Sequence, residues 1–125
     1  MQLDWNSGLV KLLGIRFVQT EKDRVVAELD IRPELLTTTG ALHGGTLMAF
    51  ADTIGAAGTA VNLEPGQSTA TLESKTNFFA AAFMGVVRAE STPLHKGRRT
   101  HVWQTRITDA NGKLLSLTIQ TQVIL

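Results

Sequence analysis

The chain has 125 residues, enough for one domain over residues 1–125 with its own hydrophobic core. Its 12 basic and 11 acidic residues nearly balance, so the net charge of +1 gives no reason to expect a nucleic acid partner. The lack of cysteine excludes disulfides, thiolate metal sites and a cysteine nucleophile, and three scattered histidines do not suggest structural zinc. Neither a signal peptide nor a membrane-spanning run is visible, so we expect a soluble, cytoplasmic protein.

The first third of the chain predicts small elements. Ser7 or Asp4 can cap a short helix that Gly14 ends. Pro33 ends the better of two strands, in which apolar and polar residues alternate. The expected elements are a helix over residues 4–13, strands over 15–20 and 24–31, and a loop over 35–42.

A long apolar helix is predicted next, from Gly44 to Asn62. Its apolar positions recur at helical spacing and include Leu47, Phe50, Ala51, Ile54, Ala57, Gly58 and Val61. Because Gly44 and Gly45 carry no side chains, the first N–H groups of this helix stay uncovered, and they favour a negative charge or a polarised oxygen.

Asp52 is the one formally charged residue between His43 and Asn62. It has no Lys or Arg at the i±3 or i±4 positions, so no neighbour on the helix pairs with it. An unpaired carboxylate is costly to bury, so it must face water, a pocket or another chain. A merely solvated position remains the alternative.

The rest of the chain predicts antiparallel strands. A turn at residues 64–66 precedes them, and Asn111-Gly112 is a strong hairpin signal between the last two. The expected strands cover residues 68–79, 85–92, 98–109 and 113–125. In the last strand we expect the core face to carry Leu115, Leu117, Ile119, Val123 and Leu125, and the other face Ser116, Thr118, Gln120 and Gln122. In residues 68–79, one face is expected to carry Ala70, Leu72, Ser74, Thr76 and Phe78, and the other Thr71, Glu73, Lys75 and Asn77.

One apolar helix lying along a curved antiparallel sheet satisfies both hydrophobic surfaces, which predicts an α+β fold. A helix rich in Ala and Gly lets the sheet wrap closely around it. Phe78, Phe79 and Trp103 are most simply core residues.

Two groups of residues could carry chemistry. The bare helix start after His43 can hold a developing oxyanion, and Asp52 can act as a base or nucleophile. They are nine residues apart, more than one helix turn, so two chains with antiparallel helices could bring one chain's helix start beside the other's Asp52. His43 could equally do no more than cap the helix.

The second group is the basic segment from His95 to Arg99, between two predicted strands. It is either a solvated hairpin end or a contact for phosphate groups, to which arginine gives bidentate hydrogen bonds. Common nucleotide-binding, zinc-protease and serine-hydrolase motifs are missing from the sequence.

Taken together, Gly40-x-x-His43-Gly44-Gly45, the aspartate nine residues after the histidine, the Thr71–Phe79 strand and Gly97-Arg98 resemble the hotdog-fold acyl-CoA thioesterases. The phenylacetate-pathway (PaaI-like) branch is the most similar, and the resemblance runs from about Gly14 to the C-terminus.

The resemblance implies a long helix wrapped by an antiparallel sheet, and homodimers with shared active sites that commonly pair into tetramers. It implies that the Gly44 N–H polarises the thioester carbonyl and that the partner's Asp52 activates water or attacks. His43 would position the thioester, and Thr71 would help place the water or Asp52. Gly97, Arg98 and Arg99 would meet the nucleotide end of coenzyme A, and Gly45 and Lys75 are also expected to bind substrate. No metal or separate cofactor is implied.

The sequence departs from the family at Thr37, where an Asn or Gln usually helps to hold the water or carbonyl, and at Ala80–Ala82, which lacks a common proline. We expect hydrolysis of a small aromatic or short-to-medium acyl-CoA to free CoA and a carboxylic acid. A non-catalytic acyl-CoA-binding or sensing protein is the alternative, which Thr37 keeps open. A hydratase or dehydratase on the same fold is a third possibility.

Overall fold

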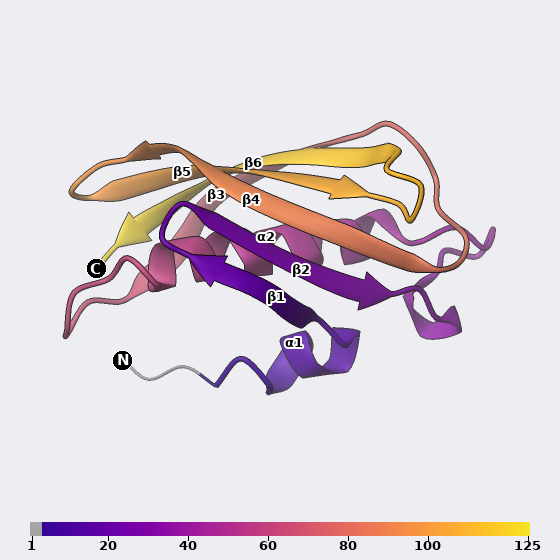
Figure 1. Cartoon of the computed structure of the whole chain (residues 1–125), viewed down its shortest axis with the longest axis horizontal. Helices are drawn as coiled ribbons and strands as arrows, with labels where there is room; N and C mark the ends of the chain where they lie inside the picture. Colours follow the sequence, from indigo (N-terminus) through magenta and orange to yellow (C-terminus); the bar gives the residue numbers. More distant parts are fainter. Residues whose placement is uncertain (1–3) are drawn as a thin grey trace.

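The computed structural model describes residues 4–125, which form two α-helices, one short 3₁₀ helix and one sheet (Figure 1). The helix that carries Asp52 is the longest helical element. In chain order the elements are α1 (Gly8–Leu13), β1 (Arg16–Glu21), β2 (Arg24–Asp30), η1 (Pro33–Leu35), α2 (Gly44–Ala60), β3 (Thr69–Phe78), β4 (Val86–Lys96), β5 (Thr100–Thr108) and β6 (Leu114–Ile124).

The sheet has the strand order β1-β2-β4-β5-β6-β3, and every neighbouring pair is antiparallel. α2 lies along one face of this curved sheet (Figure 1). The predicted α+β hotdog architecture is therefore confirmed. β1 and β3 are the two edge strands, so the outer edge of β3 is free to pair.

The boundaries follow local chemistry, with several differences from the prediction. α1 begins at Gly8 rather than at residue 4, and α2 ends at Ala60 rather than at Asn62. α1 ends at Gly14, whose φ of 76° is left-handed and suits glycine. η1 was not predicted, although Pro33 at its first position favours a helical turn. β4 continues to Lys96, so His95 and Lys96 belong to a strand rather than a loop. The last hairpin is present, but its connection runs over residues 109–113.

The sheet approaches α2 very closely at two glycines, as the small residues of the helix predicted. A Cβ atom on Gly58 would lie 2.7 Å from ring carbons of Trp103, and one on Gly55 would overlap the Gln120 side chain. Trp103 is fully buried, as predicted. The two glycines therefore set the distance between helix and sheet.

The predicted faces of β6 are wrong except at Leu115, which is fully buried in the core beside a break in the β5–β6 register. Gln120 and Gln122 are 1% and 0% exposed and face α2, whereas Ile119 is 38% exposed. Ser116 and Thr118 are also buried on the helix side. The physical reason is that hydrogen bonds with helix and neighbouring strands satisfy most of these polar groups, so the helix side can be polar while apolar residues face outward.

A β-bulge corrects the predicted faces of β3. Thr71 pairs with Gln122 and Glu73 pairs with Thr121, so Leu72 is an extra residue between them. The alternation shifts by one at this point. Thr71 therefore lies on the helix side of the sheet with Ser74. The sequence pattern had placed it on the other face, with Glu73.

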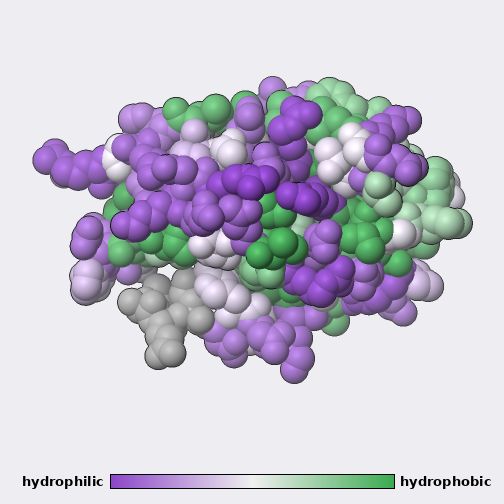
Figure 2. All heavy atoms as spheres, in the orientation of Figure 1, coloured by the Kyte–Doolittle hydropathy of each residue, from purple (hydrophilic) through white to green (hydrophobic). Residues whose placement is uncertain are grey.

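Phe78 and Phe79 are not core residues, contrary to expectation. They are 50% and 58% exposed, and Phe83 and Met84 in the following loop are exposed as well. Figure 2 shows hydrophobic atoms gathered at the end of the molecule where this β3–β4 loop runs, beside a largely hydrophilic outer face over β1, β2 and β4.

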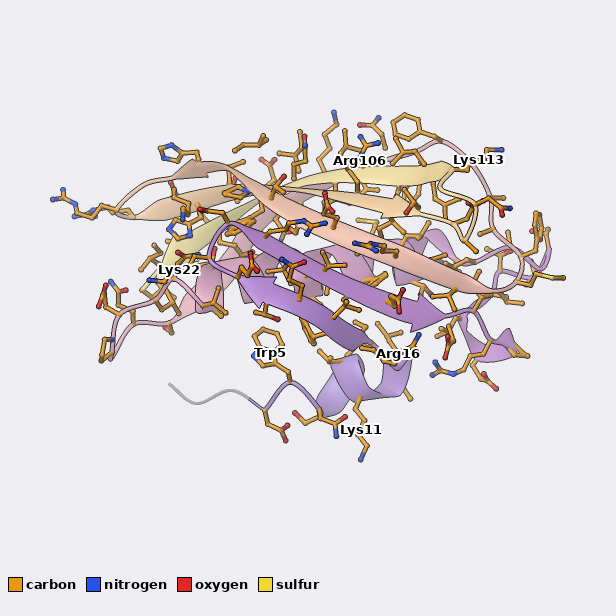
Figure 3. All side chains as sticks on the ribbon, in the orientation of Figure 1. Trp5, Lys11, Arg16, Lys22, Arg106 and Lys113 are labelled. Carbon is orange, nitrogen blue, oxygen red and sulfur yellow. The ribbon has the colours of Figure 1, made fainter. Side chains whose placement is uncertain are left out.

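The N-terminal segment covers the other edge of the sheet. Trp5 packs edge-on against Phe17 of β1, with ring centroids 5.6 Å apart (Figure 3). On the outer face of the sheet, Arg16 pairs with Asp30 and Arg24 with Glu90. Between residues 4 and 125, no helix has both the length and the hydropathy that a bilayer span requires.

Candidate active site

The start of α2 presents a bare N–H group. His43 is the N-cap, and its Nδ1 accepts a hydrogen bond of 2.7 Å from the Gly45 N–H. The His43 N–H donates to the Leu35 carbonyl, which ties the cap to η1. The Gly44 N–H comes in the first helical turn, where no carbonyl of the helix lies four residues earlier to accept it. It is thus free to polarise an oxygen of a ligand.

His43 has its Nδ1 occupied by this cap, so the neutral ring carries its proton on Nε2. Nδ1 is not available as a base. Gly44 also has a tight neighbour, because a Cβ there would lie 3.2 Å from the Phe78 ring. Phe78 therefore forms a wall beside Gly44, and His43 holds the helix start in shape.

Asp52 lies half-buried in the middle of α2, on the side that faces β3 and β6. Its Oδ1 accepts a hydrogen bond of 2.6 Å from the Thr71 hydroxyl and one of 3.2 Å from Gln120 Nε2. Gln120 Nε2 also lies 3.1 Å from the Asp52 carbonyl oxygen. Within residues 4–125 no cation forms a salt bridge with Asp52, and Oδ2 accepts no hydrogen bond, so Oδ2 is the oxygen left for chemistry.

The same network continues into the sheet. Gln122 Oε1 accepts from Gln120 Nε2 at 3.0 Å and lies 2.6 Å from the Thr71 hydroxyl. Gln122 Nε2 donates to Thr69, whose own hydroxyl donates to the Val123 carbonyl. The sequence reasoning missed both glutamines because it placed them on the outer face. The signal that could have found them is an uninterrupted run of polar residues at every second position of β6.

The helix start and Asp52 do not meet within one chain. Nine residues at 1.5 Å each separate His43 from Asp52 by about 13 Å along the helix axis. The structure does bring Asp52 and Thr71 together, as the prediction required. It does not bring either of them to Gly44, so one chain supplies two separate half-sites.

Thr37 lies before the helix start in a tight loop. Its hydroxyl is 2.8 Å from that of Thr39 and accepts from the Thr39 N–H. Its N–H donates to the Ala41 carbonyl. The side chain is therefore engaged within its own loop, and no contact in the described chain links it to Gly44 or Asp52.

The basic segment from His95 to Arg99, here called the basic hairpin, lies at the opposite end of α2 from Gly44. Lys96 pairs with Asp23 and contacts Asn62, just beyond the helix. Gly97 closes the turn through a hydrogen bond to the Thr100 carbonyl, and Arg98 and Arg99 are exposed. Both arginines are thus available to a ligand.

Lys75 is exposed on β3, where it pairs with Ile119 on the sheet face that points away from α2. The Asp52 network lies on the other face of the same strand. Within one chain, Lys75 therefore shares no site with Asp52, and its expected role in substrate binding stays a prediction.

A buried histidine lies under the basic hairpin. The Thr59 hydroxyl lies 3.0 Å from His101 Nδ1, and it accepts a hydrogen bond of 2.9 Å from Trp103 Nε1. Burial lowers the pKa of His101, and the charges of Lys96 and His95 lower it further. The contacts tie the end of α2 to β5, and burial favours the neutral form of His101.

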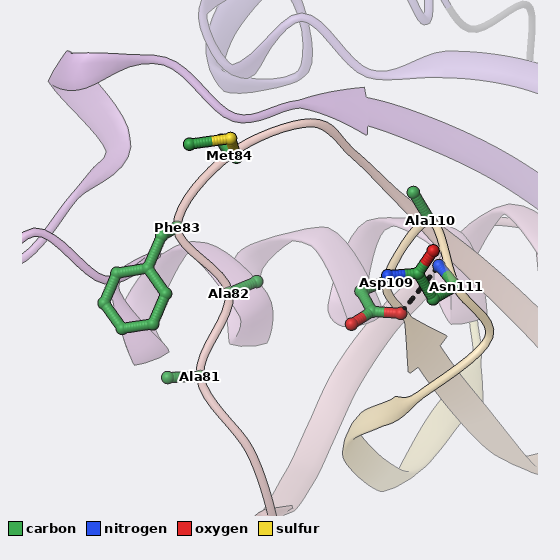
Figure 4. Close-up of a pocket in the computed structure, with 7 residues that line it drawn as sticks. All are labelled: Ala81, Ala82, Phe83, Met84, Asp109, Ala110 and Asn111. Carbon is green, nitrogen blue, oxygen red and sulfur yellow. Dashed lines mark hydrogen bonds between the residues drawn. The ribbon is translucent and has the colours of Figure 1, made fainter.

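A shallow hollow of about 310 Å³ lies between the β3–β4 loop and the β5–β6 turn (Figure 4). It is lined by Ala81, Ala82, Phe83, Met84, Asp109, Ala110 and Asn111. The loop is tied to the segment before α2, because the Leu42 N–H donates to the Ala82 carbonyl. None of the predicted site residues lines this hollow. Across residues 4–125, His, Asp and Glu side chains nowhere gather in a set of three that could hold a metal.

The fold and the two half-sites define a class of protein: a hotdog-fold protein with a bare N–H group at the start of its central helix and a carboxylate on the same helix. The comparisons with known proteins agree. The family model for the thioesterase superfamily matches residues 39–116, which include α2 and most of the sheet. The chain belongs to the thioesterase superfamily and is an enzyme of that family, as its resemblance had indicated.

Individual relatives are similar over nearly their whole length. The 1,4-dihydroxy-2-naphthoyl-CoA hydrolase of Listeria monocytogenes is 34% identical over 110 residues, which are 88% of this chain and 89% of that one. Thioesterase HI1161 from Haemophilus influenzae superposes with a TM-score of 0.92 at 29% identity, over 97% of this chain and 85% of that one. The E. coli PaaI protein shares the fold, with a TM-score of 0.89 at 22% identity over 96% and 86% of the chains.

Proposed function

We propose that this protein hydrolyses the thioester bond of a small aromatic or short-to-medium-chain acyl-CoA. The observation that carries the proposal is that α2 presents both an uncovered Gly44 N–H at its start and the half-buried Asp52 in its middle. One carboxylate oxygen of Asp52 accepts hydrogen bonds and the other accepts none. Family membership supports it, as does the relative whose name describes a naphthoyl-CoA hydrolase.

The chemistry needs few groups because a thioester carbonyl is already electrophilic. The Gly44 N–H stabilises the carbonyl oxygen as it gains negative charge. Asp52 Oδ2 takes a proton from water while the water oxygen bonds to the carbonyl carbon. The intermediate then expels the CoA thiolate, which takes the proton back from Asp52. In the alternative route, Oδ2 itself bonds to the carbonyl carbon and the C–S bond breaks, so that CoA leaves as a thiolate and a mixed anhydride remains. Water then hydrolyses the anhydride, which regenerates the Asp52 carboxylate, releases the carboxylic acid and supplies the proton that the thiolate takes up. Neither route requires a metal or a separate cofactor.

The separation of about 13 Å between the half-sites supports a site shared by two chains. The free edge of β3 and the exposed side chains of Leu72 and Phe78 on that strand offer a surface for a second copy. A two-fold axis would place each Gly44 beside the partner's Asp52. A tetramer of two such dimers follows from the family resemblance alone.

The basic hairpin suits the phosphates of coenzyme A. With antiparallel helices, the hairpin of the chain that supplies Asp52 extends past the other chain's helix start, where the CoA tail leaves the site. We expect Arg98→Ala with Arg99→Ala to raise KM for acyl-CoA about tenfold and to leave KM for a truncated thioester without the nucleotide unchanged. Equal changes for both substrates would remove the hairpin from the CoA site.

A free-thiol assay over a panel of acyl-CoA and aryl-CoA thioesters tests the function. Asp52→Asn keeps the shape and removes the base, and turnover should fall about 10²–10⁴-fold. At the helix start, Gly44→Pro removes the N–H and adds a ring next to Phe78. The backbone can accept proline there, since proline suits the first helical position and His43 already has an extended ψ of 136°. Its matched control, Gly44→Ala, keeps the N–H. Undiminished thiol release by Asp52→Asn would contradict the mechanism.

The alternative is a non-catalytic acyl-CoA binder or sensor. The closed loop of Thr37 favours it, because the hydroxyl bonds within the loop and does not extend toward the helix start. Thermal stabilisation by CoA esters with no thiol release from any of the panel would favour this second function.

A further inference from the structure

The Thr71 hydroxyl has one proton and two close acceptors. Asp52 Oδ1 and Gln122 Oε1 each lie 2.6 Å from Thr71 Oγ1. A threonine hydroxyl donates only one hydrogen bond at a time. One of the two acceptors must therefore lack this proton at any moment.

The orientation of the Gln122 amide follows from its other neighbour. The Thr69 hydroxyl donates its single proton to the Val123 carbonyl in a hydrogen bond of 2.8 Å. Thr69 can then only accept, so the amide nitrogen of Gln122 faces Thr69 and the oxygen faces Thr71. Gln120 Nε2 donates to the same oxygen, which agrees with that orientation.

We infer that the Thr71 proton changes partner with the charge on Asp52, and that Gln122 is a positioning residue that receives it. This rests on the proposed function. While Asp52 is ionised, its carboxylate is the stronger acceptor and holds the Thr71 proton. When Asp52 becomes neutral, the amide oxygen of Gln122 is the better acceptor, and the hydroxyl turns to it.

The exchange matters because Asp52 loses its charge in both possible routes. It gains a proton on Oδ2 as a base, or it forms a neutral anhydride as a nucleophile. Without Gln122, the Thr71 bond to Oδ1 would weaken in that step with nothing to replace it. With Gln122, the bond is redirected, so neutralising Asp52 costs less. Thr71 and Gln122 do not touch the reacting atoms and act through Asp52.

The surroundings of Asp52 leave this network as the main local influence on its charge. β3 and β6 pack against α2 at this point, and the side chains that bond Asp52 are Thr71 and Gln120, neither of which ionises. Glu73 and Lys75 of β3 pair with residues on the outer face of the sheet. His101 of β5 bonds Thr59, about two helix turns away.

The test is the acidic limb of the pH profile of kcat for the purified protein, measured by thiol release from the best acyl-CoA of the panel. Thr71→Val removes the donor to the ionised carboxylate, so the limb should move to higher pH. Gln122→Met removes the second acceptor, so the limb should move to lower pH. Each shift should be about one pH unit, since one hydrogen bond changes an equilibrium about tenfold.

The matched controls are Thr76→Val, on the helix side of the same strand, and Gln104→Met, on β5. Neither should move the limb. Gln122→Glu keeps the shape and adds a negative charge beside Asp52, so its limb should move to higher pH, opposite to Gln122→Met. Thr71→Ser should restore the parent profile.

Two results would overturn the proposed exchange of the Thr71 proton. In one, the acidic limb of the kcat profile stays in place in both Thr71→Val and Gln122→Met; in the other, it moves in the same direction in both. If Asp52→Asn has lost thiol release in the same experiment, the proposed function survives that result. Full activity of Asp52→Asn would overturn both.

Discussion

The two halves of the sheet present different surfaces to α2. The half formed by β2 and β4 offers a mostly apolar face, with Val25, Ala27, Leu29, Val87 and Ala89 all buried in the core and Ser91 as its one fully buried polar residue among those described. The half formed by β6 and β3 offers Ser116, Thr118, Gln120 and Gln122, equally buried but polar. Burial of apolar area stabilises a fold, whereas buried polar groups must be paired and contribute little net stability. The difference indicates that the apolar half holds the helix and the polar half holds Asp52.

The largest effect on folding should come from the apolar half. Leu29→Ala, at a position with no exposed surface, should lower the free energy of unfolding by about 3 kcal/mol, because it removes buried methyl groups and leaves a cavity. Chemical denaturation measures this loss. The kcat of the folded fraction should not change, and a large fall in kcat would contradict the division between the halves.

Overpacking at the narrowest contact should cost somewhat less. Gly58→Ala places a methyl group 2.7 Å from the Trp103 ring, which is fully buried and cannot move away freely. We expect a loss of about 2 kcal/mol in the free energy of unfolding. Gly66→Ala is a control in which the added methyl group meets no atom, since nothing lies within 4 Å of a Cβ at that position. Its positive φ of 86° should cost about 1 kcal/mol of backbone strain.

The polar half should show the reverse pattern. Gln120→Leu removes a buried amide whose Oε1 has no hydrogen-bond partner among residues 4–125 but whose Nε2 bonds Asp52 and Gln122. The free energy of unfolding should therefore fall by about 1 kcal/mol, less than for Leu29→Ala. Thiol release should nevertheless fall about tenfold, because Asp52 loses one of its two donors. A variant that unfolds easily and keeps its kcat would show that Gln120 is merely a packing residue.

The smallest effect should be a pH dependence from His101. Its pKa is lowered in the folded protein, so the unfolded chain binds a proton first as the pH falls. Stability should therefore be complete above the ordinary histidine pKa of about 6.5 and decline below it. Thermal unfolding at pH 7.5 and 5.5 should show a smaller difference for His101→Gln than for the parent protein.

Much of the fold was predictable because its signals are local. The spacing in α2, the glycines at its start and the hairpin signal at Asn111-Gly112 each depend on a few neighbouring residues. The faces of β6 and the position of Thr71 were not. A bulge at Leu72 depends on pairing with a distant strand, and the burial of Gln120 and Gln122 depends on partners that the sequence does not place.

The candidate site divides in the same way. Asp52 was predicted from its isolation in an apolar helix, and Gly44 from its position at the helix start. The direction of each side chain required the structure: the cap that occupies His43 Nδ1, the loop that occupies Thr37, and the two donors on one oxygen of Asp52. Their catalytic roles stay predictions until the variants are assayed.

The most direct test of the shared site is a mixing experiment with Asp52→Asn and Gly44→Pro, each nearly inactive alone. The two variants are unfolded together in equal amounts, refolded and assayed for thiol release. If each site takes Gly44 from one chain and Asp52 from the other, half of the dimers are mixed and each regains one intact site, which restores about a quarter of the parent activity. If both groups act within one chain, no chain carries an intact pair, and the mixture stays as inactive as its components.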